Sequence, residues 1–341
     1  MVAQPIITGI LSYGMSGRVF HAPFIEASNF FVFKAIVERS KKKAQFDYPQ
    51  VVSYDSISEL LDDEEIELVI VNTPNDTHFD FAKKALLSGK HVLIEKPFSP
   101  TVAEAQELFE IGKQTDRCVL PFHNRRFDSD FKSLKYILDR NLVGKPIELH
   151  MRFDRFKPEI GPKIFKETPR PASGVLYDLG SHLLDQAISL FGRPKSATKI
   201  LSQNRPNTKV DDYASLILNY QDGLNVFITT SLLVASPQKS FVLHGANGTF
   251  IKDRTDVQEA QLQFGMSPLD PSYGMEHEGQ EGVLTVILND VSEEIDVSSE
   301  KGNYMELFDA IYQTIRLRVP YFVSSEQILW QLEILSPSQK S

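Results

Sequence analysis

The sequence predicts a two-domain α/β protein, and three observations lead to this prediction. In residues 1–124, short apolar runs alternate with amphipathic, helix-like segments, which is the pattern of a parallel sheet with crossover helices. In residues 125–341, several strand-like runs follow one another without intervening helices, which indicates an antiparallel or mixed sheet. The length of 341 residues, with 42% hydrophobic content, is enough for two separate cores.

Six strands are expected in the first domain. In chain order they are PIITGIL, FVFKAIV, VVSY, ELVIVN, HVLIE and CVLPF. Two of the intervening helices have well-marked starts, because Ser56 with Glu59 and Thr101 with Glu104 have the spacing of a capping box.

The second domain should contain alternating strands and a few helices. The expected strands are IELHMRFDRF, ASLILNYQ, LNVFITTSLLV, FVLHG and TVIL, followed by helical segments near 304–318 and 325–335. One helix should interrupt the strands from about Asp178 to Phe191, because Gly192 and Pro194 follow it in the order typical of a helix stop.

Composition narrows the function classes. A net charge of -9, with KKK at 41–43 as the longest basic run, argues against a nucleic-acid partner and favours a small-molecule substrate. The single cysteine, Cys118, excludes an internal disulfide framework and a cysteine-based zinc site. The N-terminus lacks the basic region of a signal peptide, and no window approaches the roughly 18 apolar residues of a membrane span. We therefore expect a soluble cytoplasmic protein with no membrane partner.

The first motif is a glycine-containing turn after the first strand. In ITGILSYGMSGRVFHAPF, Gly14 and Gly17 lie where the next helix begins, and such a turn lets a dinucleotide pyrophosphate approach the free N–H groups of the helix. The strict G-x-G-x-x-G fingerprint is not met, because Ser12 replaces the first glycine and Gly9 lies inside the strand. The alternative is an ordinary tight turn between strand and helix.

The end of the second strand bears on the choice of coenzyme. Glu38 stands where a carboxylate can accept hydrogen bonds from the ribose hydroxyls of NAD, whereas Arg39, Ser40 and the following lysines could bind the 2′-phosphate of NADP. Because a carboxylate repels a phosphate, we expect a slight preference for NAD, with use of both coenzymes.

Further polar residues follow the fourth strand. The stretch NTPNDTHF places Thr73, Pro74, Asn75 and His78 at the carboxyl edge of the predicted sheet, where ligands of open α/β sheets bind. For His78, a role in starting the next helix is an equal alternative.

Lys96 follows the fifth strand and should project into the same crevice. Pro97 holds Lys96 in an extended conformation and ends the strand. On its own, Glu95-Lys96-Pro97 is a weak signal, since a lysine at a strand end is more often a surface residue.

Asp178 and His182 strengthen the case for a catalytic site. They lie four residues apart on the predicted helix and therefore share one face, although such a pair can also be a simple ion pair. Transfer of a hydride from an alcohol needs a base for the hydroxyl proton and a cation near the oxygen, and His182 and Lys96 suit those tasks. Asp178 would then orient the imidazole of His182.

A third polar patch, FHNRRFD, lies at the end of the sixth strand. Its side chains at His123, Asn124, Arg125 and Arg126 are donors for hydroxyl or carboxylate groups of a substrate. The alternative, stronger for Arg126 than for its neighbours, is a cluster of salt bridges between the domains.

The segments GMSGRVFHAPF, NTPNDTHF, IEKPF, FHNRRFDSDF and YDLGSHLLDQ together resemble the Gfo/Idh/MocA oxidoreductases, most closely the branch of NADP-dependent scyllo-inositol dehydrogenase. The resemblance implies a Rossmann domain followed by an α/β domain with an open, mostly antiparallel sheet, an active site between them, and a homodimer or homotetramer formed through that sheet. It also implies that Lys96, Asp178 and His182 are catalytic, that the Lys96-Pro97 bond is cis, and that no metal is used.

The binding residues implied by the resemblance form two sets. Coenzyme binding is expected of Gly9, Ser12, Gly14, Met15, Ser16, Gly17, Glu38, Arg39, Thr73, Pro74, Asn75, His78, Glu95, Lys96, Pro97 and Lys166. Substrate binding is expected of His123, Asn124, Arg125, Tyr177, Asp178 and His182.

Three departures from the family pattern limit this inference. Ser12 replaces a glycine, Phe165 and Lys166 stand where relatives have a Trp-Arg pair near the coenzyme, and Glu38-Arg39 replaces the Ser-Arg of the NADP-dependent branch. The predicted activity is hydride transfer between NAD or NADP and a secondary alcohol or ketone of a sugar, inositol or polyol. Two alternatives are an NAD-dependent glycoside hydrolase and a non-catalytic coenzyme sensor. Loops 157–172 and 265–282 are expected to decide the substrate.

Overall fold

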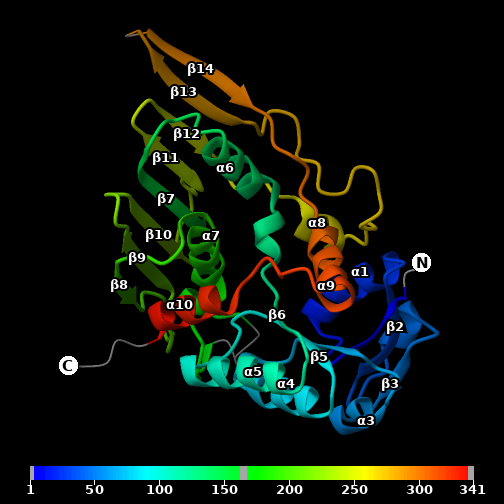
Figure 1. The fold of residues 1–341 in the computed structure, drawn as a ribbon. Coiled ribbons are helices and arrows are strands. Elements are labelled where there is room, and N and C mark those ends of the chain that lie inside the picture. Colours follow the sequence, from blue (N-terminus) through cyan, green and yellow to red (C-terminus); the bar gives the residue numbers. More distant parts are fainter. Residues whose placement is uncertain (1–3, 162–166, 290, 337–341) are drawn as a thin grey trace. The chain divides into compact units, whose positions relative to one another are not determined.

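The computed structural model describes residues 4–161, 167–289 and 291–336 (Figure 1). The chain packs as two compact units. Unit 1 contains the chain up to Asn124 together with Gln258–Tyr273 and Asn303–Leu329, and unit 2 contains Arg125–Val257, Gly274–Gly302 and the chain from Trp330.

These units differ from the predicted domains 1–124 and 125–341 in two segments. Residues 258–273 and 303–329 pack with the N-terminal unit because their aromatic side chains complete its core. The ring of Phe308 stacks on Phe24 with centroids 5.0 Å apart, and Tyr273 contacts Phe24 edge-on at 6.3 Å. Apolar contacts between residues distant in sequence therefore decide the composition of unit 1.

Unit 1 is built on a six-stranded parallel sheet with the order β3-β2-β1-β4-β5-β6, which confirms the predicted Rossmann-type sheet. Its strands are β1 (Ile6–Ile10), β2 (Phe31–Val37), β3 (Val52–Tyr54), β4 (Leu68–Val71), β5 (His91–Ile94) and β6 (Val119–Pro121). The strand order reverses between β1 and β4, and in open α/β sheets ligands bind beside the carboxyl ends of strands at such a reversal.

Helices connect and cover these strands. They are η1 (Gly17–His21), α1 (Ala22–Ala27), α2 (Ala44–Asp47), α3 (Ile57–Asp62), η2 (Asn75–Thr77), α4 (His78–Leu87), α5 (Val102–Gln114), α8 (Gln258–Gln263) and α9 (Met305–Leu317). Both predicted helix starts are confirmed: Ser56 accepts a hydrogen bond from the Glu59 N–H, and Thr101 with Glu104 forms a complete capping box.

Unit 2 is built on an eight-stranded sheet with the order β14-β13-β12-β11-β7-β10-β9-β8. Its strands are β7 (Pro146–Asp154), β8 (Ser196–Ser202), β9 (Tyr213–Asn219), β10 (Asn225–Ser231), β11 (Phe241–Gly245), β12 (Gly248–Lys252), β13 (Gly282–Leu288) and β14 (Val291–Val297). Every neighbouring pair is antiparallel except β7 with β10. The prediction of an open, mostly antiparallel sheet is confirmed.

The sequence did not predict β8, β12 or β14. The outer strands β8 and β14 are mostly exposed on both faces, so they lack the alternation of apolar and polar residues that marks a half-buried strand. Strand β12 is only five residues long and follows β11 after a tight turn. Pairing with a neighbouring strand, and not local sequence, makes these segments extended.

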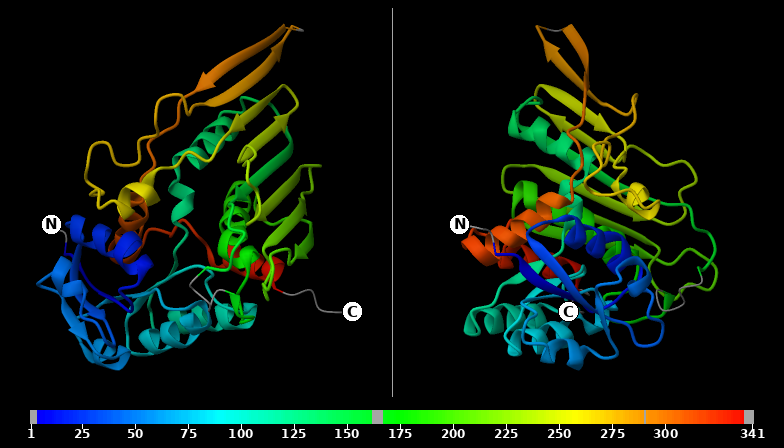
Figure 2. Two further views of the ribbon diagram at one scale, coloured as in Figure 1. Left: turned by 180° about the vertical axis from the view of Figure 1, so that it is seen from behind. Right: turned by 90° about the vertical axis from the view of Figure 1, so that its right-hand side faces the viewer.

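Helices cover one face of the unit 2 sheet. Among the described residues, the other labelled helices are η3 (Asn124–Phe127), α6 (Ser129–Asp139), η5 (Leu176–Gly180), α7 (Ser181–Phe191) and α10 (Ser325–Leu335). Side chains of α6 and α7 form one apolar core with the alternate residues Leu149, Met151 and Phe153 of β7, and Figure 2 shows both helices beside the sheet. Helix α7 ends at Gly192, whose φ of 74° suits a helix stop, as predicted.

Of the helices in the described residues, none combines the length and the apolar character that a membrane crossing needs.

Candidate active site

The turn after β1 has a defined hydrogen-bond structure. The Ser12 hydroxyl accepts a hydrogen bond from the Gly14 N–H at 3.2 Å, and the Gly14 carbonyl accepts one from the Arg18 N–H at 3.0 Å. Asn72, directly after β4, donates its side-chain amide to the Ser12 carbonyl at 2.8 Å. The turn is therefore held from both strands that flank the reversal of strand order, β1 and β4.

The three glycines of this region have different roles. A Cβ atom on Gly17 would lie 2.1 Å from the Ser12 carbonyl oxygen, so only glycine fits there. A Cβ on Gly14 would meet only the Ser12 hydroxyl, at 3.5 Å, so the space at this residue stays open. Gly9 lies within β1, where a Cβ would press on Leu60 at 3.0 Å, so its small size serves the packing of α3. Open space at Gly14 beside the start of a helix fits a pyrophosphate group.

Glu95 ties the end of β5 to the helical segment that follows this turn. Its carboxylate accepts hydrogen bonds from the Ser16 hydroxyl at 2.6 Å, from His21 Nε2 at 2.9 Å and from the Lys96 N–H at 3.2 Å. Burial alone would raise the pKa of Glu95, but the hydrogen bond and charge of His21, the Ser16 hydroxyl and the charge of Lys96 outweigh it and lower the pKa to about 2. Glu95 therefore remains a carboxylate and fixes the orientation of Ser16.

His78 links the loops that follow β4 and β5. Its two ring nitrogens lie 2.9 Å from the Pro97 carbonyl oxygen and 2.8 Å from the Thr73 carbonyl oxygen, and the side chain is buried. Burial lowers the pKa of His78 despite these carbonyl partners, and a neutral imidazole donates to only one of them. His78 also begins α4, so the helix-start alternative holds as well.

The other predicted residues of the β4 loop lie beside His78. Thr73 shares a hydrogen bond of 2.7 Å with Thr77, and the Thr77 hydroxyl also lies 2.7 Å from the Pro74 carbonyl oxygen, while Asn75 opens η2. The loop is therefore ordered at the carboxyl edge of the sheet, where it was expected.

Glu38 differs from its predicted environment. It lies directly after β2 and is only 8% exposed. Its carboxylate accepts hydrogen bonds from the Lys43 N–H at 2.8 Å, from the Ala44 N–H at 3.2 Å and from the Ser53 hydroxyl at 3.0 Å. These contacts close the loop between β2 and α2. The carboxylate thus has structural partners, which weakens the argument that it serves the ribose of NAD.

Lys96 lies at the carboxyl end of β5, as predicted. Its side chain is half-buried, and the Lys96–Pro97 peptide bond is cis, which confirms that expectation. The neighbouring Glu95 carboxylate and the Pro97 carbonyl, held by His78, fix the backbone on both sides of the lysine.

In unit 2, Asp178 and His182 lie on one continuous helical segment formed by η5 and α7. Asp178 belongs to η5, which has π-helical hydrogen bonding, and π-bulges inside helices frequently mark functional sites. His182 lies in the first turn of α7 and is 7% exposed. Tyr177 is also buried, and burial, followed by the charge of Asp211, raises its pKa to about 12.

Asp211 fixes the start of this helical segment. Its carboxylate accepts a hydrogen bond from the Leu176 N–H at 2.8 Å, and its backbone carbonyl accepts one from the Val175 N–H at 2.9 Å. The carboxylate lies against Gly174, where an added Cβ would be 1.9 Å from Asp211 Oδ1. A residue 33 positions after Asp178 in the sequence thus holds the helix that carries the predicted catalytic pair.

The patch at residues 123–126 divides between the units. His123 and Asn124 are buried in unit 1, whereas Arg125 and Arg126 belong to unit 2. Arg126 forms a bidentate pair with Asp185 of α7, at 2.8 and 2.7 Å. The Arg125 carbonyl accepts a hydrogen bond from Gln186 at 2.8 Å. The salt bridge considered for Arg126 exists, but both of its partners lie within unit 2.

The Arg125 side chain also has partners in unit 2. Its guanidinium pairs with Asp128 at 3.2 Å and lies 5.3 Å from the centre of the Phe153 ring.

Lys96 belongs to unit 1, whereas Asp178 and His182 belong to unit 2. Lys166, predicted to contact the coenzyme, lies outside the described residues. The described residues contain no group of three or more His, Cys, Asp or Glu side chains placed to hold a metal ion.

Sequence reasoning missed four residues that shape the site: Asn72, His21, Asp185 and Asp211. Asn72 could have been found, since a polar residue directly after a buried strand at the reversal point is a weak signal of function. Asp185 carried a signal too, because it continues the polar face of Asp178 and His182. His21 and Asp211 carried none, because their partners are distant in sequence.

Comparisons with known proteins agree with this arrangement. The model of an oxidoreductase family with an NAD-binding Rossmann fold matches residues 6–123, and the model of the GFO/IDH/MocA C-terminal domain matches residues 131–251. The oxidoreductase YdgJ of Escherichia coli is 35% identical, over 98% of this chain and 95% of its own length.

Two further similarities cover nearly the whole chain. The scyllo-inositol 2-dehydrogenase (NADP(+)) IolW of Bacillus subtilis is 30% identical, over 98% of this chain and 93% of its own. The crystal structure of an oxidoreductase from Bacillus cereus superposes with a TM-score of 0.90 and 34% identity, over 98% of this chain and 97% of that one. The residues after β1, β4 and β5 fit the dinucleotide that such a fold binds. The chain belongs to the GFO/IDH/MocA oxidoreductase family, and it is an NAD(P)-dependent dehydrogenase or reductase.

Proposed function

We propose that this enzyme transfers a hydride between a nicotinamide coenzyme and a secondary alcohol or ketone of a sugar, an inositol or a related polyol. The observation that carries the proposal is the pair Asp178 and His182, a carboxylate and a buried imidazole four residues apart at a π-helical segment. The similarity to IolW supports the substrate class, as does 26% identity over 51% of this chain to an inositol 2-dehydrogenase of Salmonella paratyphi B.

The residues of this chain have distinct tasks in the proposed reaction. Bound NAD or NADP supplies the nicotinamide that accepts the hydride from the alcohol carbon or returns it to the ketone. In the oxidation, the His182 imidazole takes the hydroxyl proton, and Asp178 holds the imidazole in the required orientation and stabilises its charged form. The Lys96 ammonium stabilises the negative charge that develops on the alcohol oxygen.

The remaining predicted residues are proposed to bind and place the reactants. Gly14 leaves room for the pyrophosphate at the start of the helix, and Met15 and Ser16 would bind it, with Ser16 held by Glu95. His123, Asn124, Arg125 and Tyr177 would contact substrate hydroxyls, since they offer several donors and acceptors.

We further propose that NADP is preferred over NAD. The Glu38 carboxylate accepts hydrogen bonds from Lys43, Ala44 and Ser53, so donors of the protein already occupy its oxygens. Arg39 and Lys41 of the same loop are exposed, and these cations suit a 2′-phosphate.

Two finer expectations complete the proposal. We propose a homodimer or homotetramer formed through the open face of the unit 2 sheet, which is supported by apolar side chains on that face that are about half exposed, at Ile200 and Ile287. We also propose a cytoplasmic location, as the composition indicated.

The test is a change in absorbance at 340 nm with a panel of inositols and hexoses, with NAD and NADP in parallel. Lys96→Ala should lower kcat by roughly 100- to 10,000-fold, the range for loss of one polarising or proton-transferring group. Lys83→Ala is the matched control, since Lys83 is a partly exposed lysine of unit 1 that pairs with Glu107 on the surface. Full activity of Lys96→Ala, or coenzyme binding without turnover of any substrate, would refute the proposal.

A further inference from the structure

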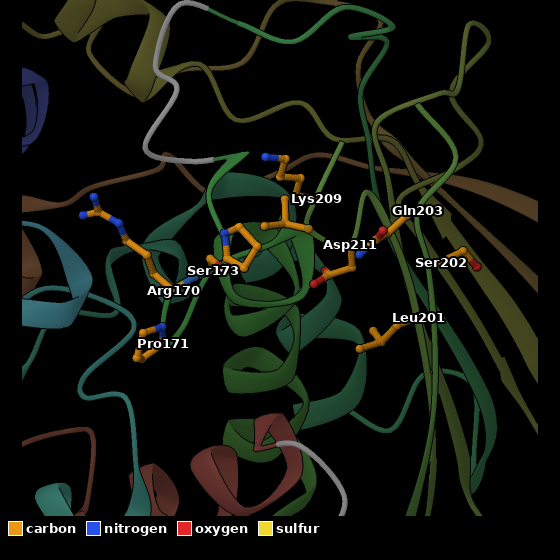
Figure 3. A pocket seen from close by; sticks show the side chains of 10 residues that line it. Arg170, Pro171, Ser173, Leu201, Ser202, Gln203, Lys209 and Asp211 are labelled. Atoms are coloured by element: carbon orange, nitrogen blue, oxygen red, sulfur yellow. Dashed lines mark hydrogen bonds between the residues drawn. The ribbon is translucent and has the colours of Figure 1, made fainter. Parts of the chain in front are cut away.

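Unit 2 contains a pocket whose lining includes none of the residues given a role in the proposed reaction. Its volume is about 740 Å³, within the range of small-molecule sites. Three segments line it: residues 169–173 before η5, residues 201–203 at the end of β8, and residues 209–211 before β9. Figure 3 shows Asp211 between the turn that carries Ser173 and the strand end that carries Leu201.

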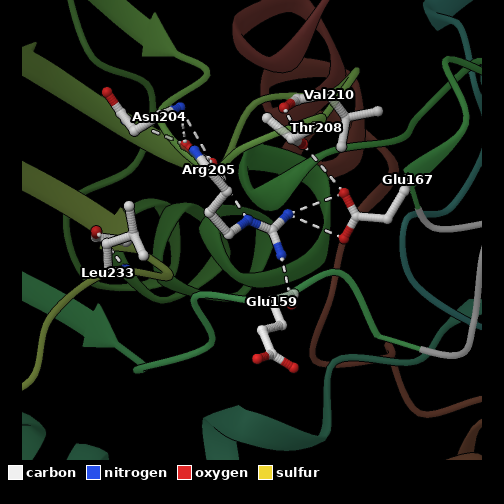
Figure 4. A network of polar contacts seen from close by, with 9 residues as sticks. Glu159, Glu167, Asn204, Arg205, Thr208, Val210 and Leu233 are labelled. Atoms are coloured by element: carbon white, nitrogen blue, oxygen red, sulfur yellow. Dashed lines mark hydrogen bonds and ion pairs between the residues drawn. The ribbon is translucent and has the colours of Figure 1, made fainter.

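A buried arginine joins the walls of this pocket. Arg205, whose side chain is 2% exposed, lies in the loop between β8 and β9. Its guanidinium contacts the Glu167 carboxylate through two oxygens at 2.9 Å each (Figure 4). It also contacts the Asp212 carboxylate at 3.2 Å. Thr208 donates a hydrogen bond to the same Glu167 carboxylate at 3.1 Å. The segment before η5 and the β8–β9 loop are thereby fastened to each other, so the pocket is preformed.

The lining combines three kinds of group. Leu201 and two proline side chains offer apolar surface for the C–H faces of a ring. Ser173, Gln203 and Asp211 offer donors and acceptors for hydroxyl groups. Arg170 and Lys209 are exposed at the lining and give it two positive charges. Apolar ring contacts, hydroxyl partners and cations together are what a carbohydrate with an acidic group requires.

The pocket is adjacent to the helix that carries Asp178 and His182. Asp211 lines the pocket and also accepts the hydrogen bond of the Leu176 N–H, two residues before Asp178. A ligand that contacts Asp211 therefore touches the residue that holds the start of this helix.

We propose that this pocket binds an anionic carbohydrate, with Arg170 and Lys209 holding its carboxylate or phosphate and Asp211 with Gln203 binding its hydroxyls. The binding does not depend on turnover, so it can be tested apart from the proposed reaction.

The experiment is isothermal titration calorimetry on the full-length protein without coenzyme. Three ligands that differ only at C6 are compared: galactose, which is neutral, galacturonate, which carries a carboxylate, and galactose 6-phosphate, which carries a phosphate. At least one of the two acids should bind at least tenfold more tightly than galactose, and its affinity should fall as salt is added, because the cations are exposed. The acid that binds more tightly identifies the preferred anion.

Two protein variants test whether the acid binds in this pocket. The double variant Arg170→Ala with Lys209→Ala should weaken binding of the acid at least tenfold and leave the fold intact, since both side chains are exposed. Lys239→Ala is the matched control, because Lys239 is an exposed lysine of unit 2 that pairs with Asp253 and does not line the pocket. Equal binding of galactose and both acids, no binding of any of them, or an unchanged affinity in the double variant would overturn the proposal.

Discussion

Replacing Gly17 with alanine tests the turn that is expected to hold the coenzyme. The added Cβ would lie 2.1 Å from the Ser12 carbonyl oxygen, whereas ordinary contact begins at 3.4 Å, so the backbone must move by about 1.3 Å. This shift disrupts the hydrogen bond of 2.8 Å from Asn72 to the same oxygen. Overpacking costs roughly 1–3 kcal/mol and a lost hydrogen bond about 1 kcal/mol, so we expect a total of about 2–4 kcal/mol.

The free-energy cost of Gly17→Ala should appear partly as a lower stability of the protein and partly as weaker binding of the coenzyme. If the turn keeps its shape, the strain lowers the free energy of unfolding; if the turn moves, the dissociation constant of NADPH rises by roughly 30- to 1,000-fold. Urea unfolding followed by circular dichroism measures the first quantity, and titration of NADPH fluorescence measures the second. Their sum is the quantity to compare with the expected cost.

Gly14→Ala is the control for this prediction. Its Cβ would meet only the Ser12 hydroxyl at 3.5 Å, so stability should change by less than about 0.5 kcal/mol. Loss of NADPH binding in Gly14→Ala with unchanged stability would place the pyrophosphate beside this residue. A Gly17→Ala protein that unfolds at the wild-type urea concentration and binds NADPH with the wild-type dissociation constant would refute the reasoning.

Three further predictions concern the supports of the site. The pKa of Glu95 is lowered from 4.5 to about 2, so its ionised form should contribute roughly 3 kcal/mol above pH 4.5 and lose this contribution as the pH falls toward 2. Urea unfolding of Glu95→Gln between pH 7 and pH 3 should therefore depend less on pH than that of wild type; parallel curves would contradict this. Arg126→Ala leaves the Asp185 carboxylate buried without its bidentate partner. The free energy of unfolding, measured with urea, should therefore fall by about 3–5 kcal/mol. A fall below about 1 kcal/mol would show that stability does not depend on this ion pair. Gly174→Ala would displace the Asp211 carboxylate from the start of η5. We therefore expect kcat to fall, while the dissociation constant of NADPH, measured on the same protein, stays within twofold. An unchanged kcat would show that Asp211 does not position the helix of Asp178 and His182.

The sequence by itself determined the parts of this protein whose causes are local. The six strands of unit 1, the helix starts at Ser56 and Thr101, and the end of α7 at Gly192 were all predicted, because apolar periodicity, capping side chains and a glycine stop act within a few residues. The family motifs also lie in short segments, so the sequence was sufficient to propose Lys96, Asp178 and His182 as catalytic residues.

The tertiary structure decided what depends on partners distant in the sequence. The donors to the Glu38 carboxylate include the Ser53 hydroxyl, and the helix of Asp178 starts at a bond from Leu176 to Asp211. No local pattern marks such contacts, because they form only when the chain brings separate segments together. For the same reason β8 and β14 were not predicted, because pairing with neighbouring strands stabilises them and their own sequences have no strand pattern. Residues 303–329 pack with unit 1 because of aromatic contacts such as Phe308 on Phe24, which no local pattern predicts.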